Sequence, residues 1–330
     1  MNNTTLKKIA TTLGCSISTV SRALKHHPDI SVKTRERILE LANTLDYEPN
    51  AFAVHLRTQN SKVMGLLVPA ISNYFYESFI ASVEEECRKN GYALMILQTA
   101  NNPITETDNL KIFRQNRVTG LFACISANTN TLADYYKLTD QNIPIIFFDN
   151  VPEEKSLNKV CMADERAAIL AAEALLAANK KNIIGVFGDP RMSITQKRLT
   201  AFENYFSNNN DQTTITIIHA TNSEDAETLI SNQLNDKKKA DAIFCMSDEL
   251  LIGAMKAVQI KKLSLPTDIG LIAISNGFVP KLYYPTITYV ETSGHKLGKL
   301  AFTHLMACIS GSTAVNELTV DSVLIKGGSL

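Results

Sequence analysis

Apolar residues in the first part of the chain recur at the spacing of an α-helix, with polar residues between them. Thr5 can cap a first helix with its hydroxyl, and Gly14 supplies the turn at its end. The inward positions of this helix, spaced i, i+3, i+4 and i+7, are Leu6, Ile9, Ala10 and Leu13. This stripe predicts one buried helical face.

Two further helices follow with the same kind of pattern. Ser16 can cap the second helix, and a third helix begins near Ser31 and ends before Pro49. Their expected inward residues are Val20, Ala23, Leu24, Ile38, Leu41, Ala42 and Leu45. Two short helices around a tight turn, packed on a third, are typical of a helix-turn-helix unit, which places its second helix in a DNA major groove. An ordinary three-helix module with a solvated Ser/Thr face is the alternative.

Ile17 allows two interpretations at the start of the second helix. It lies three residues before Val20 and can therefore belong to the core. In the first turn of a recognition helix it can instead contact a thymine methyl group. We favour the groove.

After about Ser61 the pattern changes to short apolar runs that alternate with helical stretches. The expected strands are Val63–Val68, Ala93–Leu97, Gly120–Ile125, Ile143–Phe148, Lys159–Met162, Ile183–Phe187, Thr214–Ile218, Ala242–Met246 and Ile269–Ile274. The expected helices include Tyr76–Arg88, Arg166–Ala178, Arg198–Ser207 and Glu249–Ile260. This alternation predicts parallel sheets with right-handed crossovers, in two similar subdomains.

Polar residues follow the ends of these strands, where ligands of parallel sheets bind. They occur in VPAISNYFY after the first strand, at Asp149, in GDPRMSITQKR, at Ser247–Asp248 and at Ser275-Asn276-Gly277. A cleft between the subdomains would therefore be lined by hydrogen-bonding groups and by Phe75 and Tyr76, which suits a small polar ligand stacked on aromatic rings.

Charge and cysteine usage narrow the function classes. The 330 residues have no net charge, but residues 1–60 hold eight basic and five acidic side chains, so the head carries +3 and the remainder −3. The head is thus the part that faces a polyanion. The six cysteines are scattered without a CxxC pair and are expected to be buried, reduced thiols of a cytoplasmic protein. We expect neither secretion nor a membrane span, because no signal core and no long apolar run occur.

The segments TLKKIA, GCSISTVSRAL, ISVKTRERILELA and LDYEPN resemble the head of the LacI/GalR family of bacterial transcription regulators, and the similarity continues through the core. The resemblance implies that Ile17, Ser18 and Arg22 face base edges, with Arg22 the natural guanine reader. It assigns phosphate contacts to Thr5, Ser16, Thr19 and Ser21. Lys8 departs from the acidic residue usual in the family, and its charge opposes the helix dipole.

The segment after Pro49 corresponds to a hinge helix that forms when this family binds DNA. By that resemblance Asn50 caps the hinge helix, Ala53 permits close approach, and Leu56 wedges into a minor-groove base step. The alternative for Leu56 is a linker residue without such a role.

The same resemblance implies an effector site in the cleft of a core similar to periplasmic sugar-binding proteins. Its matched positions are Phe75, Tyr76, Asp149, Arg198, Asn222, Ser247, Asp248 and Ser275. Arg198 would grip two ligand oxygens, although pairing with Glu203 or another acid is the alternative. Asp149 and Asp248 can also serve as helix or turn caps. Ser247 replaces the usual Asn and Ser275 the usual Asp, which makes a common hexose a less secure ligand.

We therefore expect an α/β protein with an all-α head and a two-subdomain parallel-sheet core. The expected parts are a helix-turn-helix domain at 1–48, a hinge at 49–60 and an effector-binding and dimerisation core at 61–330. Within the core we expect an N-subdomain at about 61–157 plus 289–318 and a C-subdomain at about 158–288 plus 319–330.

The expected function is that of a sequence-specific transcriptional regulator, of the repressor type, in the cytoplasm at the nucleoid. A homodimer would bind a pseudo-palindromic double-stranded DNA operator under control of a small polar effector, expected to be a sugar or sugar derivative. Whether the effector releases or promotes DNA binding stays open. By resemblance, the dimer surface lies around residues 76–88 and 279–284.

Two rival classes are a sugar-binding receptor without DNA function and an α/β enzyme that uses Asp149 as a base. The head opposes the first. GxGxxG, GxxxxGK[ST], HExxH and GxSxG are absent from the sequence, which opposes the second. The six His residues show no metal spacing, so we expect no cofactor, no metal and no catalysis.

Overall fold

The computed structural model describes residues 5–47, 61–209, 212–235 and 240–330. It divides into two compact units, Met1–Ser61 and Lys62–Leu330. The hinge residues Asn50, Ala53 and Leu56 lie outside the described residues.

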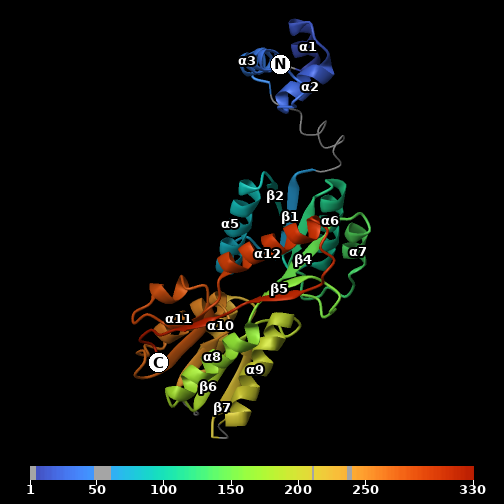
Figure 1. Cartoon of the computed structure of the whole chain (residues 1–330). Helices are drawn as coiled ribbons and strands as arrows, with labels where there is room; N and C mark the ends of the chain where they lie inside the picture. The colour runs from blue at the N-terminus through green and yellow to red at the C-terminus, as the bar shows by residue number, and fades with distance from the viewer. Residues whose placement is uncertain (1–4, 48–60, 210–211, 236–239) are drawn as a thin grey trace. The chain divides into compact units, whose positions relative to one another are not determined.

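The head consists of α1 (Leu6–Leu13), α2 (Ile17–Leu24) and α3 (Val32–Thr44) (Figure 1). The expected caps are confirmed. Thr5 Oγ1 accepts from the Lys8 amide at 3.3 Å, and Ser16 Oγ accepts from the Thr19 amide at 3.0 Å. Gly14 ends α1 with φ 64°, a left-handed conformation that glycine adopts without a Cβ clash.

The head has a small apolar core contributed by all three helices. Its buried members are Ile9, Ala10, Val20, Ala23, Ile38 and Ala42, with Leu6, Leu13, Leu24, Leu41 and Leu45 partly buried around them. The inward faces expected from the apolar spacing are therefore the faces that pack, which leaves the Ser/Thr side of α2 free.

The core unit contains two six-stranded sheets. The first has the order β11 (Glu317–Val320), β5 (Lys159–Met162), β4 (Ile145–Phe148), β3 (Gly120–Ala123), β1 (Val63–Val68) and β2 (Ala93–Gln98). The second has the order β12 (Val323–Ile325), β10 (Thr288–Glu291), β9 (Gly270–Ser275), β8 (Ala242–Cys245), β6 (Asn182–Phe187) and β7 (Thr214–His219). Among the described residues, all strand pairings are parallel except that of β12 with β10.

Helices cover both faces of the first sheet. α5 (Tyr74–Lys89) and α12 (Gly294–Ile309) contribute Phe79 and Leu297 to one face, whereas α6 (Pro103–Gln115) and α7 (Ala133–Thr139) pack on the other. α12 begins tightly against the first turn of α5, since a Cβ on Gly294 would lie 2.5 Å from the Phe75 carbonyl oxygen. A glycine at this position therefore lets α12 hold the start of α5.

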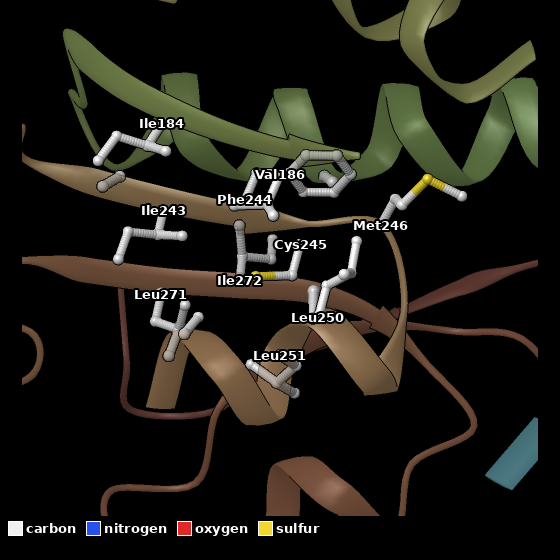
Figure 2. Packing of buried hydrophobic residues seen from close by; sticks show 14 of the residues in the cluster. Ile184, Val186, Ile243, Phe244, Cys245, Met246, Leu250, Leu251, Leu271 and Ile272 are labelled. Atoms are coloured by element: carbon white, nitrogen blue, oxygen red, sulfur yellow. The ribbon is translucent and has the colours of Figure 1, made fainter. Parts of the chain in front are cut away.

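The second sheet is flanked by α8 (Asp164–Ala177) packed on α9 (Ser193–Asn209) and by α10 (Ser223–Gln233) packed on α11 (Asp248–Ile260). A short 3₁₀ helix, η1 (Val279–Leu282), follows β9. Figure 2 shows Ile184 and Val186 of β6, Phe244 of β8 and Ile272 of β9 side by side in this core. Strands buried on both faces read as continuous apolar runs, and the sequence has that pattern here.

The chain crosses between the two sheets three times, and each crossover lies a few residues later than expected. β5 pairs with β4 and β11 in the first sheet, so the first subdomain extends past residue 157 to Met162. β10 pairs with β9, so the second subdomain extends past residue 288 to Glu291. β11 also belongs to the first sheet, which moves the last boundary from 318 to Val320. In each case the pairing partner of a short strand determines to which sheet that strand belongs. The spacing of apolar residues does not reveal this partner.

Within the described part of the chain, no helix has the length and apolar character needed to cross a bilayer.

Candidate DNA-binding face and effector cleft

The outer face of α2 presents the residues expected to read bases. The side chain of Ile17 is 48% exposed and lies outside the apolar cluster of the head, so the structure does not use it as core. Ser18 and Arg22 are exposed too. Positions 17, 18, 21 and 22 share one side of a helix, opposite the buried Val20 and Ala23.

Hydroxyl groups at the start of α2 form a short hydrogen-bonded row. Ser16 Oγ lies 2.7 Å from Ser18 Oγ and 2.8 Å from Thr19 Oγ1. Arg22 Nη1 lies 3.8 Å from Asp29 Oδ2 at the surface, a distance that holds the guanidinium only loosely. The arginine can therefore leave its acidic neighbour for a base edge.

A cavity of about 560 Å³ lies between the two subdomains of the core. Seven of the eight expected effector residues line it, namely Phe75, Tyr76, Asp149, Arg198, Ser247, Asp248 and Ser275. They come from the first turn of α5, the end of β4, the middle of α9, and the ends of β8 and β9. The cavity therefore brings together residues up to 200 positions apart in the sequence, Phe75 and Ser275.

Asn222 is the member that the structure does not place on this wall. It is exposed and caps α10, because its Oδ1 accepts from the Asp225 amide at 2.9 Å. The chain turns into its helix directly after β7, which leaves Ala220 and Thr221 to line the cavity instead.

Asp149 and Tyr76 line the cavity on the side of the N-subdomain. The Tyr76 hydroxyl donates to Asp149 Oδ2 at 2.5 Å, and the Cys124 thiol lies 3.9 Å from the same oxygen. Burial raises the pKa of Asp149, although the hydrogen bond from Tyr76 opposes that effect. The backbone of Asp149 has φ 61°, a left-handed value that Asp and Asn tolerate better than most residues.

Arg198 is 5% exposed and is already paired with an acid, as the alternative interpretation allowed. The partner is Asp164 at the start of α8, not Glu203. Nε and Nη2 lie 2.9 and 2.7 Å from Asp164 Oδ1, and Nη1 donates to the Met246 carbonyl at 2.5 Å. These contacts use three of the five guanidinium N–H groups, so two remain for a ligand in the described surroundings.

Asp248 is the buried carboxylate on the C-subdomain side. Ser275 Oγ donates to its Oδ1, and the Asn276 amide donates to its Oδ2 at 3.0 Å. Ser247, not Asp248, caps α11. Ser275 thus does not supply the carboxylate acceptor that is usual in the family at this position. Its hydroxyl proton is donated to Asp248. Burial raises the pKa of Asp248.

Hydrogen bonds between the subdomains flank the cavity and were not expected from the sequence. Asn150 Oδ1 accepts from the Ser193 amide at 2.8 Å, and Ser193 Oγ accepts from the Val151 amide at 3.0 Å. A further hydrogen bond links the subdomains, because Asn276 Nδ2 after β9 donates to the Tyr74 carbonyl at the start of α5 at 2.7 Å. The two subdomains are therefore linked at residues adjacent to expected effector contacts.

Asp164, Asp189 and Arg191 are further functional candidates that sequence reasoning missed. Asp189 and Arg191 line the cavity, and Arg191 donates to Asn128 of the other subdomain. A signal existed for each of them. Asp164 is the first acid after the run that forms β5, and the other two lie in the polar stretch after β6.

Comparisons with known proteins agree with this architecture. Residues 5–50 match the family model "Bacterial regulatory proteins, lacI family", and residues 172–330 match "Periplasmic binding protein-like domain". The HTH-type transcriptional regulator DegA of Bacillus subtilis (strain 168) is 27% identical over 297 residues, covering 89% of this chain and 88% of that protein. The ribose operon repressor of Haemophilus influenzae is 28% identical, covering 92% and 91%.

Other relatives include the HTH-type transcriptional repressor PurR of Histophilus somni (strain 129Pt), 26% identical over 95% of both chains. Among solved structures, the Lac repressor dimer bound to operator and the anti-inducer ONPF has the same fold, with a TM-score of 0.90 at 20% identity over 99% of both chains.

Fold and site define a two-part regulator, with a helix-turn-helix head followed by a periplasmic-binding-protein-like core around a polar cleft. Residues 5–50 form a domain of the lacI family of bacterial regulatory proteins, and the relatives that cover about nine tenths of the chain are transcriptional regulators. Its relatives are DNA-binding transcriptional regulators and not enzymes.

Proposed function

We propose that this chain is a sequence-specific transcriptional repressor whose operator binding is controlled by a small polar effector in the cleft cavity. The observation that carries the proposal is the cavity itself, with seven expected effector residues around it in a chain that also has a recognition helix. The named relatives support it, because PurR and the ribose regulator are both repressors.

On the DNA side, Ile17, Ser18 and Arg22 read base edges, while Thr5, Ser16, Thr19 and Ser21 contact phosphates. The exposure of Ile17 and Arg22 supports the first assignment. Short hydroxyl side chains suit phosphate contacts, because they bring little bulk to the backbone of the duplex. One head reads few base pairs, so two heads on a pseudo-palindromic operator supply the specificity.

The hinge assignments rest on the family resemblance alone. Asn50 caps the hinge helix, Ala53 lets it approach DNA, and Leu56 wedges into a base step of the minor groove. A helix this short is unstable by itself, so its formation depends on packing against a partner and DNA. A small shift between the core subdomains can therefore decide whether the hinge helix forms.

On the effector side, a donor-rich ligand binds between Asp149 of one subdomain and Asp248 of the other, with Arg198 contributing its two remaining N–H groups. Phe75 offers an aromatic surface from α5. Because the walls come from both subdomains, a ligand that contacts both changes the balance between their arrangements. The polar lining suits a carbohydrate, and the neighbour structure of the regulator CelR is a cellobiose complex. We propose binding without turnover.

A homodimer is the assembly that we propose, with its interface at α5 and the segment 279–284. Exposed apolar side chains in and beside that segment support the choice. Phe278, Leu282 and Tyr284 are 54%, 62% and 95% exposed. A monomer rarely leaves neighbouring large apolar residues this exposed, whereas a partner would cover them. The dimer works in the cytoplasm, at the nucleoid.

Two measurements on the full chain test the proposal. Selection from a random double-stranded DNA pool should enrich one pseudo-palindromic sequence, and failure to enrich any sequence would remove the DNA-binding function. A thermal-shift screen across sugars, sugar phosphates and nucleosides should yield a compound that raises the melting temperature. That compound should change operator affinity and be recovered unchanged. Formation of product would contradict the assignment as a pure regulator.

A further inference from the structure

The cavity between the subdomains has more negative than positive groups on its walls. Its lining carboxylates are Asp149, Asp189, Asp248 and Glu249, and its lining guanidinium groups among the described residues are Arg191 and Arg198. The described walls therefore carry a net formal charge of −2 when all six groups are ionised. A ligand meets even less positive charge than this net charge of −2 indicates, because of how the two guanidinium groups are arranged.

Both lining cations are already matched by acids. Arg198 is bound to Asp164, which lies behind it and is 3% exposed at its side chain. Arg191 holds Asp189 through Nε at 2.9 Å and Nη2 at 2.5 Å, and this contact lowers the pKa of Asp189. Neither guanidinium offers a full positive charge to a ligand.

The other three carboxylates are held by neutral donors within the described structure. Asp149 accepts from the Tyr76 hydroxyl, and Asp248 accepts from Ser275 Oγ and the Asn276 amide. Glu249 Oε1 accepts from the Ser223 amide at 3.0 Å. Burial raises the pKa of Asp149 and Asp248, and the positive charge of Arg198 opposes this effect without cancelling it.

An anionic ligand in this cavity would lose hydration and meet two buried like charges. At an effective dielectric constant of about 20, one such repulsion at roughly 6–8 Å weakens binding by about 30- to 100-fold. A hydroxyl group has no such penalty and donates to a carboxylate. An ammonium group gains a charge-assisted hydrogen bond as well.

We propose that the effector is a donor-rich carbohydrate without an anionic group, and that an amino sugar binds more tightly than its uncharged counterpart. This inference rests on the effector site of the proposed function. It excludes sugar phosphates and sugar acids as effectors.

The test measures thermal shift of the full chain with matched triads at pH 7.5. Each triad contains a free hexose, its 2-amino derivative and its 6-phosphate, for glucose, galactose and mannose. Within the triad that stabilises the chain, the amino sugar should bind at least about fivefold more tightly than the free sugar. The 6-phosphate should give no shift at 10-fold higher concentration, set roughly by the repulsion above.

Asp149→Asn separates charge from shape. Asn tolerates the left-handed backbone at this position and keeps an acceptor for Tyr76, so the variant removes charge with little other change. It should lose the preference for the amino sugar and gain measurable binding of the 6-phosphate, a shift of about tenfold in their ratio. Glu203→Gln removes one exposed charge from α9 without touching the cavity and should change neither ratio.

Tighter binding of the 6-phosphate than of the free sugar would overturn the inference and leave the regulatory function intact. An unchanged ratio in Asp149→Asn would also overturn it, since charge would then not set the preference. A panel in which no member shifts the melting temperature overturns it too. Operator selection without any sugar decides separately whether the proposed regulatory function fails.

Discussion

Arg198 and Asp164 form a buried ion pair that joins α9 to the start of α8, with Nη2 2.7 Å from Oδ1 and both side chains at most 6% exposed. Arg198 lines the cavity, whereas Asp164 does not. Arg198 therefore holds the C-subdomain together at the same place where it faces a ligand.

Arg198→Ala should consequently damage the core as well as the effector response. It leaves the carboxylate of Asp164 buried without a cation, which typically costs about 3–5 kcal/mol. Urea unfolding of the core transition measures this cost, with Glu203→Gln as the surface control. The double variant Arg198→Ala/Asp164→Ala should be less destabilised than the sum of the single variants. Additive losses would show that the pair is not coupled.

Arg22→Ala should weaken operator binding by about 1–3 kcal/mol and relax one base position. The 3.8 Å contact with Asp29 is exposed, so we expect almost no loss of head stability. Fluorescence anisotropy with the selected operator gives the affinity, and repeated selection with the variant gives the base preference. Arg37→Ala removes the same charge from an exposed position on α3 and serves as the control. An unchanged selected sequence would contradict base reading by Arg22.

The sequence predicted most of the elements, because their signals are local. Thr5 and Ser16 cap the first two helices of the head as expected, and Ser31, near which the third helix was expected to begin, caps that helix. The strand β1 begins and ends where the run Val63–Val68 does. Buried parallel strands require continuous apolar residues, and such runs are visible in the sequence.

The parts that escaped prediction depend on contacts distant in the sequence. The strands β10, β11 and β12 are three or four residues long. Only their pairing partners determine to which sheet they belong. The choice of Asp164 over Glu203 as partner of Arg198 depends on which helix lies beside α9. The family resemblance assigned Asn222 to the cavity wall, but its side chain caps α10 instead.

Ser193→Ala should weaken the link between the subdomains beside the cavity. The substitution removes the Ser193 hydroxyl, so the Val151 amide loses its acceptor at 3.0 Å. An unsatisfied amide at such a buried position costs about 1–3 kcal/mol. Ser207→Ala on the same helix removes a surface hydroxyl that bonds only to the Glu203 carbonyl, and it is the matched control.

Effector affinity distinguishes a linking role of Ser193 from a purely local one. If the hydrogen bonds to Asn150 and Val151 help to set the subdomain arrangement, Ser193→Ala should change the affinity for the stabilising compound by at least about threefold, a modest coupling on the usual scale. Isothermal titration on Ser193→Ala and Ser207→Ala measures this. Equal affinities in both variants would confine Ser193 to stability.

The buried carboxylate of Asp149 should make the stability of the core depend on pH. Its folded-state pKa is raised above the ordinary value of 3.8, first of all by burial. The folded chain therefore binds this proton more readily than the unfolded chain does between 3.8 and the raised value. Stability must then rise as the pH falls through that window, since the slope follows the excess of protons bound by the unfolded state.

Asp149→Asn isolates this contribution, because the amide resembles the protonated acid and does not titrate. Urea unfolding of wild type and variant at several pH values from 7.5 down to 3.5 gives the difference between them across the window that begins at the ordinary pKa. Wild type should gain stability relative to Asp149→Asn as the pH falls through that window. A constant difference would mean that Asp149 titrates alike in the folded and unfolded chain. A relative loss would mean that the Tyr76 hydrogen bond outweighs burial and lowers the pKa of this carboxyl.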